Sequence, residues 1–240
     1  MIRILLVLIL VLIDFIISLP MFLIGYIVGL FSKRAKDVMW QVIVKIYLRV
    51  IGWMAGAKVN YIGLENIPKD TAVLYVGNHS SYFDIVLSYP VLPGVAGFIA
   101  KKELLKVPVL AQIMIQVRCL FLDRDNIKEG LKLILKAVED IKSGISLFIF
   151  PEGTRSKDGN IAEFKEGSLK IATKAGCPIV PVAFSNTSAI FEDHFPFIKA
   201  AKVTIEFGKP IYVNELDKEE QKHIGKKVHD LIVDMKNQEA

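Results

Sequence analysis

Short apolar runs alternate with amphipathic stretches over most of the chain, from residue 58 onward. Runs of four to six mostly apolar residues predict strands, and apolar residues that recur every three or four positions predict helices. Strands that alternate with helices indicate an α/β fold with a mostly parallel central sheet flanked by helices. The predicted strands are 59–62, 72–77, 97–100, 119–122, 146–150, 179–184 and 203–207, and the predicted helices lie near 81–89, 102–116, 127–142, 162–175 and 216–236.

The N-terminal part has a different pattern. Residues 4–31 are almost entirely apolar and carry one charge, Asp14, and the basic segment 32–36 follows them. Because no A-x-A-like site stands there, we do not expect a cleaved signal peptide. As one helix this run would be roughly 42 Å long, enough to cross the ~30 Å hydrocarbon core of a bilayer.

Pro20 divides the apolar run into segments 4–19 and 20–31, each too short to span alone. The run is either a single kinked transmembrane helix or a helical hairpin inserted into one leaflet. We favour the hairpin, because Asp14 would be costly at the middle of a lone span.

Residues 36–54 mix aromatic, aliphatic and basic residues in a helical pattern. This pattern is typical of an interfacial helix whose aromatic residues lie at headgroup depth and whose cations face phosphates. It also suits a helix that packs on the globular domain. We therefore divide the chain into a membrane-anchoring helical segment, 1–57, and an α/β catalytic domain, 58–240.

Composition narrows the choice of partners. The chain has a net charge of +5, a mean hydropathy of +0.43 and no basic stripe with interleaved aromatic residues. Anionic lipids or phosphorylated substrates therefore fit better than nucleic acid. Cys119 and Cys177 lie in apolar runs and are expected to be buried free thiols without a catalytic role, and no spacing suggests a metal site.

Three polar clusters follow predicted strands, where ligands of α/β sheets usually bind. The first contains His79 and Asp84, at a strand-to-helix turn that could bring the two side chains together. An imidazole held by a carboxylate can remove a proton from a hydroxyl. A second pair with the same spacing, His229 and Asp234, lies in a predicted helix, where the two side chains diverge by about 140°.

The other two clusters carry arginines. Arg124 follows the strand 119–122, between two aspartates, and could bind a phosphate or form surface ion pairs. The segment 150–156 reads Phe-Pro-Glu-Gly-Thr-Arg-Ser and places Gly153 between Glu152 and Arg155. The glycine allows an unusual backbone angle or the close approach of a ligand.

Taken together these motifs resemble the glycerolipid acyltransferase family, especially bacterial 1-acylglycerol-3-phosphate acyltransferases. The resemblance rests on four blocks in family order over roughly residues 58–210: His79-x4-Asp84, Cys119–Arg124, Phe150–Arg155 and Ile179–Phe184. It implies that the chain transfers an acyl group from acyl-CoA or acyl carrier protein to the sn-2 hydroxyl of lysophosphatidic acid, giving phosphatidic acid, without a further cofactor. It also implies a cytoplasmic or inner membrane location, with the catalytic domain facing the cytoplasm.

The resemblance also assigns roles to residues. It implies that His79 is the general base and Asp84 its partner. It further implies that the acceptor is bound by Lys101, Arg124, Glu152, Gly153, Thr154 and Arg155. We expect direct transfer rather than an acyl-enzyme on Ser80 or Ser81, because a neighbouring residue rarely reaches the imidazole correctly.

Two other classes of function remain open at this point. A membrane esterase would need a G-x-S-x-G nucleophile elbow, which the sequence lacks. A non-catalytic lipid-binding module would need only the arginines and the anchor, and the acceptor could also be glycerol-3-phosphate or a lysophospholipid.

Overall fold

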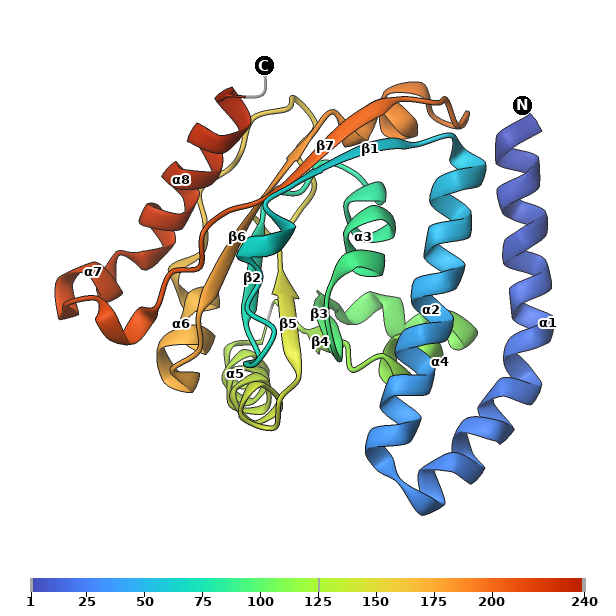
Figure 1. The fold of residues 1–240 in the computed structure, drawn as a ribbon, viewed down its shortest axis with the longest axis horizontal. Helices are drawn as coiled ribbons and strands as arrows, with labels where there is room; N and C mark the ends of the chain where they lie inside the picture. The colour runs from blue at the N-terminus through green and yellow to red at the C-terminus, as the bar shows by residue number, and fades with distance from the viewer. Residues whose placement is uncertain (1, 125, 239–240) are drawn as a thin grey trace.

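The computed structural model describes residues 2–124 and 126–238, and of Asp14, Phe15 and Ile127 the backbone only. The described residues form a seven-stranded sheet with strand order β1-β7-β6-β2-β5-β3-β4, flanked by helices on both faces (Figure 1). Each predicted strand is present, within two residues at each end: β1 (Lys58–Ile62), β2 (Leu74–Gly77), β3 (Ala96–Lys101), β4 (Leu120–Leu122), β5 (Ser146–Ile149), β6 (Ile179–Ser185) and β7 (Lys202–Phe207).

The strand directions confirm a mostly parallel sheet. Strands β6, β2, β5, β3 and β4 run parallel to one another, whereas β7 is antiparallel to β6 and β1 is parallel to β7. The carboxyl ends of five neighbouring strands therefore meet at one edge of the sheet. The segments that follow them, together with the last residue of β3, contain the predicted site residues.

Two layers of helices cover the sheet. The helices are α1 (Ile2–Phe31), α2 (Lys33–Ala55), α3 (Phe83–Ser88), α4 (Pro108–Gln116), α5 (Ile127–Lys142), α6 (Glu166–Ala175), α7 (Lys218–Lys222) and α8 (Ile224–Gln238). Figure 1 shows α2 and α3 on one face and α6 and α8 on the other. Successive residues of β2 alternate between the two cores: Tyr75 packs in the cluster on the α2 and α3 side, and Leu74 and Val76 pack in the cluster with α5, α6 and α8.

Local chemistry accounts for the helix boundaries. Helix α5 begins at the predicted residue, because the side chain of Asn126 accepts hydrogen bonds from the backbone N–H groups of Lys128 and Glu129. The predicted helix 102–116 is split into a 3-10 turn (Lys102–Lys106) and α4, since Pro108 disfavours a helical Val107. The predicted helix 216–236 is likewise divided at His223 into α7 and α8.

The N-terminal hairpin differs from the predicted one. Helix α1 continues through Pro20, and the chain reverses at Ser32, so α1 pairs with the antiparallel α2 (Figure 1). The helix tolerates the proline at the cost of a bend, which is visible in the C-terminal part of α1. The prediction of a hairpin between segments 4–19 and 20–31 is therefore wrong in its boundaries, and the side chain of Asp14 lies outside the described part.

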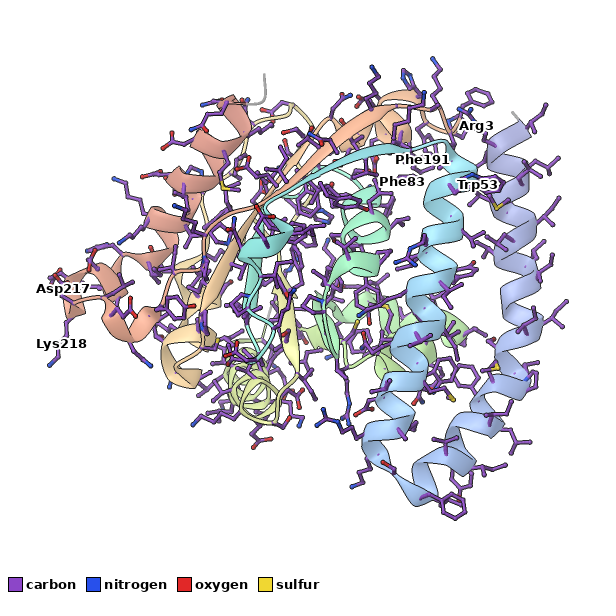
Figure 2. The ribbon with its side chains drawn as sticks, in the orientation of Figure 1. Arg3, Trp53, Phe83, Phe191, Asp217 and Lys218 are labelled. Carbon is purple, nitrogen blue, oxygen red and sulfur yellow. The ribbon has the colours of Figure 1, made fainter. Side chains whose placement is uncertain are left out.

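The contact between the two helices requires a small residue. A Cβ atom at Gly25 would lie 2.6 Å from Nε1 of Trp40, so no other residue fits there without a shift. By length and composition, both helices could cross a membrane, with mean hydropathies of 2.9 and 1.4. The side chains of α1 point largely into open space, and only 6% of its most apolar 18-residue stretch is buried (Figure 2). The two apolar helices favour an association with membranes.

Helix α2 belongs both to the hairpin and to the globular part. Its Trp40 is 2% exposed, so this side chain lies in the core, and the prediction that it lies at headgroup depth is wrong. Lys45 donates to the carbonyls of Leu92 and Gly94, and Arg49 donates to that of Pro90. The prediction that these two cations face lipid phosphates is therefore wrong, because both donate to carbonyls that hold α2 on the domain.

Candidate active site

The candidate site is built on the segments that follow the parallel strands. Counted across the sheet, residues 186–192 follow β6, residues 78–82 follow β2, and residues 150–156 follow β5. Lys101 ends β3, and Arg124 follows β4. These segments are far apart in the sequence and come together only because their strands are neighbours.

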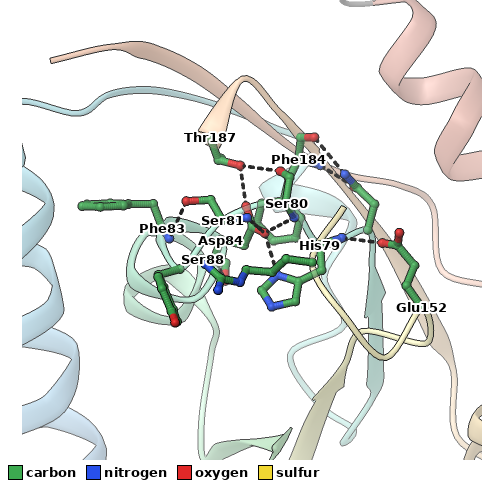
Figure 3. A network of polar contacts seen from close by, with 12 residues as sticks. His79, Ser80, Ser81, Phe83, Asp84, Ser88, Glu152, Phe184 and Thr187 are labelled. Carbon is green, nitrogen blue, oxygen red and sulfur yellow. Dashed lines mark hydrogen bonds and ion pairs between the residues drawn. The ribbon is translucent and has the colours of Figure 1, made fainter. Parts of the chain in front are cut away.

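His79 and Asp84 form the centre of the site. The ring nitrogen Nδ1 of His79 lies 2.8 Å from Oδ2 of Asp84, whose side chain is fully buried (Figure 3). Because a carboxylate can only accept hydrogen bonds, Nδ1 carries the proton and Nε2 of the neutral ring keeps its lone pair. The predicted pairing of these two side chains is therefore present.

The spacing of the pair follows from the turn that joins β2 to α3. Asp84 lies in the first turn of α3 and its Oδ2 accepts the backbone N–H groups of Ser80 and Ser81, each at 2.8 Å. The carboxylate thus closes the turn and holds the imidazole at the same time. By contrast, His229 and Asp234 lie along α8, and His229 contacts Asp230 and the carbonyl of Ile161 instead.

The backbone and ring of His79 are fixed on three further sides. Its N–H donates to Oε1 of Glu152 at 2.6 Å, and its carbonyl accepts the N–H of Ser156 at 2.7 Å. Its ring stacks on Phe150, with centroids 4.0 Å apart and planes 15° from parallel. Among the described residues none bonds to Nε2, which leaves this atom available to a ligand.

Glu152 connects two loops. Besides the His79 N–H, its second carboxylate oxygen accepts the N–H of Ala162 at 3.0 Å. Burial raises the pKa of the Glu152 carboxyl above its ordinary value, although the two backbone N–H groups oppose this shift. This bond ties the segment around Ala162, which forms no helix or strand, to the site, and α6 begins at Glu166 and not at the predicted residue 162.

Gly153 is the position where two cations approach the loop. Its φ is +79°, a conformation that other residues adopt only with strain. A Cβ atom there would lie 3.5 Å from Cζ of Arg124 and 3.3 Å from Nζ of Lys165. Arg124 therefore reaches the Glu-Gly-Thr-Arg segment as predicted, and Lys165 is a neighbour that the sequence analysis did not identify.

Arg155 points toward the other side of the site. Its Nη1 donates to Oε1 of Glu192 at 2.7 Å, and its guanidinium lies over the ring of Tyr82, 3.8 Å from the centroid. Lys101 and Thr154 are exposed, and no contact among the described residues joins either side chain to His79. Of the two aspartates next to Arg124, Asp123 pairs with Lys102 at 2.9 Å and Asp125 lies outside the described residues, so the alternative of surface ion pairs for Arg124 stays a prediction.

The sequence analysis missed two residues of the segment after β6. Thr187, which is fully buried, donates its hydroxyl to Oδ1 of Asp84 at 2.5 Å (Figure 3). Glu192 accepts hydrogen bonds from Ser81, Tyr82 and Arg155. The sequence offered one hint: the strand 179–184 was predicted to belong to the same mostly parallel sheet, so the polar residues after its end could also have been considered as site residues.

Neither cysteine suits catalysis. Burial raises the pKa of the Cys119 thiol to about 12 and that of the Cys177 thiol to about 11, so both are protonated at neutral pH. Within the described part of the chain, no group of three His, Cys, Asp or Glu side chains could hold a metal ion.

Comparisons with known proteins agree with this geometry. The acyltransferase family model matches residues 58–185. A 1-acyl-sn-glycerol-3-phosphate acyltransferase of Borreliella burgdorferi is 32% identical over 83% of this chain and 78% of its own length. An enzyme of the same name from Cocos nucifera is 32% identical over 78% of this chain and 60% of its own length. The crystal structure of the 1-acyl-sn-glycerophosphate (LPA) acyltransferase PlsC of Thermotoga maritima superposes with a TM-score of 0.75 at 26% identity, over 96% of both chains.

The fold and the matched segment define an acyltransferase. The chain belongs to the acyltransferase family, and the family predicted from its four motifs is confirmed. The matched residues 58–185 include His79, Asp84 and Arg155, but Thr187 and Glu192 lie beyond them.

Proposed function

We propose that this protein transfers an acyl group from a thioester donor to the sn-2 hydroxyl of 1-acylglycerol-3-phosphate, giving phosphatidic acid. The observation that carries the proposal is the geometry of His79, whose Nδ1 is held by a buried carboxylate while Nε2 is unpartnered among the described residues. The acceptor is the one named for the relatives, both bacterial and eukaryotic.

The proposed reaction needs one base. His79 Nε2 removes the proton of the acceptor hydroxyl as its oxygen attacks the thioester carbonyl carbon. The tetrahedral intermediate then loses the thiolate as the C–S bond breaks, and the imidazolium returns the proton to the sulfur. General-base help of this kind contributes about 10² to 10⁴ in rate. Asp84 stabilises the imidazolium that forms between the two steps.

Two arginines of the candidate site, Arg124 beside Gly153 and Arg155 beside Glu192, support recognition of a phosphate. In this proposal Arg124 and Arg155 bind the phosphate of the acceptor, because guanidinium groups match its oxygens bidentately. Lys101 adds positive charge at the same sheet edge, and Glu152, Gly153 and Thr154 line the acceptor site. Holding two lipid-like substrates in register would contribute to the rate at least as much as the base.

The developing oxyanion needs hydrogen-bond donors. The N–H groups nearest the pair are already occupied: those of Ser80 and Ser81 bind Asp84, and that of Gly153 binds the carbonyl of Phe150. Gly153 and the start of α3 are therefore poor candidates for this role. The N–H of Thr154 has no hydrogen-bond partner among the described residues, so we propose this group as a donor to the oxyanion.

The hairpin supports an attachment to one leaflet. Because α2 packs against α3, the 3-10 turn Tyr89–Val91 and α4, it cannot cross the bilayer without drawing the domain into it. We therefore propose that α1 lies within the cytoplasmic leaflet of the cell membrane, with the basic segment 32–36 at the headgroups and the site facing the cytoplasm. The acyl donor would then be acyl-CoA or acyl carrier protein.

An acceptor panel tests the function. Purified protein receives a labelled acyl-CoA or acyl carrier protein together with lysophosphatidic acid, glycerol-3-phosphate or lysophosphatidylcholine, and product formation is measured for each. We expect the highest kcat/KM with lysophosphatidic acid, and a raised KM for it in Arg155→Ala. A preference for lysophosphatidylcholine, or an unchanged KM in Arg155→Ala, would contradict the proposal.

A further inference from the structure

Glu192 is a half-buried carboxylate that binds three groups of the site. It lies in a short 3-10 turn (Glu192–His194) in the segment after β6. Its Oε2 accepts the hydroxyl of Ser81 at 2.6 Å, and its Oε1 accepts the N–H of Tyr82 at 2.9 Å and Nη1 of Arg155 at 2.7 Å. Both oxygens are thus committed to the protein, so Glu192 is placed to orient other groups and not to bind the substrate.

The three partners come from two different loops. Ser81 and Tyr82 belong to the turn that carries His79, whereas Arg155 belongs to the segment after β5. Glu192 therefore links the loop of the proposed base to the proposed phosphate ligand through one side chain. Phe191, the residue before it, packs against the core on the side of α3 and contacts the ring of Tyr82, which anchors the segment next to Glu192 (Figure 2).

The ion pair with Glu192 holds Arg155 but occupies only part of its hydrogen-bond donors. A guanidinium has five N–H donors, and Glu192 takes one of them. The ring of Tyr82 supports the guanidinium from its face, a contact that also orients the plane of the group. The remaining donors keep a fixed direction, which lowers the entropic cost of binding a phosphate.

We propose that Glu192 is a positioning residue that orients Arg155 toward the acceptor phosphate and connects Arg155 to the loop of His79. The inference rests on the proposed function, because it assumes that Arg155 binds the phosphate. The direction in which acceptor binding changes when Glu192 is lost distinguishes this role from the alternative. A carboxylate near a phosphate repels it, so a Glu192 that only competed for Arg155 would weaken acceptor binding, and its loss would strengthen binding. A positioning role predicts the opposite.

The test compares Glu192→Gln, which keeps the shape but loses the charge, with Asp193→Asn at the next position. Asp193 accepts a hydrogen bond from Ser188, and among the described residues no hydrogen bond or ion pair joins its side chain to the loop of His79 or to the segment after β5. For Glu192→Gln we expect the KM for lysophosphatidic acid to rise about tenfold, as expected from losing a hydrogen bond to a charged group. The KM for the thioester donor should change less than about twofold, and Asp193→Asn should match the wild type in both constants.

A double-mutant cycle separates positioning from a general loss of structure. If Glu192 acts through Arg155, adding Glu192→Gln to Arg155→Ala should raise the acceptor KM by less than about twofold more. Independent, multiplying effects would overturn the inference, as would an unchanged or lowered acceptor KM in Glu192→Gln alone. An unchanged KM in Arg155→Ala would refute the phosphate role itself, so the two failures can be told apart.

Discussion

Thr187 donates its hydroxyl to Oδ1 of Asp84, on the oxygen opposite the one that receives the ring N–H of His79. With the N–H groups of Ser80 and Ser81, this bond fills the acceptor sites of a carboxylate that has no access to water. A buried carboxylate is stable only when such donors are present. Thr187 therefore belongs to the structure that sets the imidazole, although it lies 103 residues from Asp84.

Removal of this hydroxyl should affect turnover more than binding. Thr187→Val keeps the volume of the side chain but leaves Oδ1 of Asp84 without its donor, so the free energy of unfolding should fall by about 1–3 kcal/mol. We expect kcat to fall about tenfold, because a misplaced imidazole lies farther from the attacking hydroxyl, while the KM of either substrate changes little. Steady-state kinetics of Thr187→Val and Thr187→Ser provide the check, since the serine hydroxyl should restore most of kcat. Equal losses in both variants would argue against a role of this hydrogen bond.

Gly153 offers a test in which backbone strain and site chemistry can be separated. Its φ of +79° and the φ of +80° at Gly159 are nearly identical, but a Cβ atom at Gly159 meets nothing within 4 Å. Alanine should therefore cost about 1 kcal/mol of unfolding free energy at either position. Only Gly153→Ala should also raise the acceptor KM, since its methyl group points at Arg124. A similar KM change in both variants would show that strain alone is responsible.

Glu152 should make stability depend on pH. Burial raises the pKa of this carboxyl in the folded protein, so its protonated form favours folding. Its contribution is fully present below the unfolded pKa, near 4.5, and is lost as the pH rises through the higher folded value. Glu152→Gln cannot ionise, so the stability of wild type relative to this variant should be greater at pH 4 than at pH 7. Thermal unfolding of both proteins at the two pH values gives the answer, and a difference that grows with pH would contradict the assigned shift.

The sequence predicted the sheet well because its strands are short apolar runs bounded by turn residues, and such runs have few alternatives. It also predicted the pairing of His79 with Asp84, since both residues lie in one local turn. The ends of the helices were harder to predict. Pro20 was expected to divide a helix, but α1 continues through it with a bend and packs against α2 at Gly25.

What the sequence did not predict depends on neighbours in space. Thr187 and Glu192 are ordinary polar residues after a strand, and only the strand order places them beside the turn of His79. The direction of Arg155 is set by Tyr82 and Glu192, neither of which has a local spacing relationship with it. Tertiary contacts of this kind leave no periodic or motif signal in a single sequence.

The central claim is that the His79 imidazole is the base that activates the acceptor hydroxyl. The direct measurement is consumption of a labelled acyl thioester in the presence of lysophosphatidic acid, for wild type, His79→Ala and His229→Ala. His229 serves as the control because it has the same spacing to an aspartate but lies on α8 and bonds to Asp230. We predict that His79→Ala lowers kcat by about 10² to 10⁴ with its thermal unfolding retained, and that His229→Ala stays near the wild type. A His79→Ala protein that is folded and turns over at the wild-type rate would contradict the account.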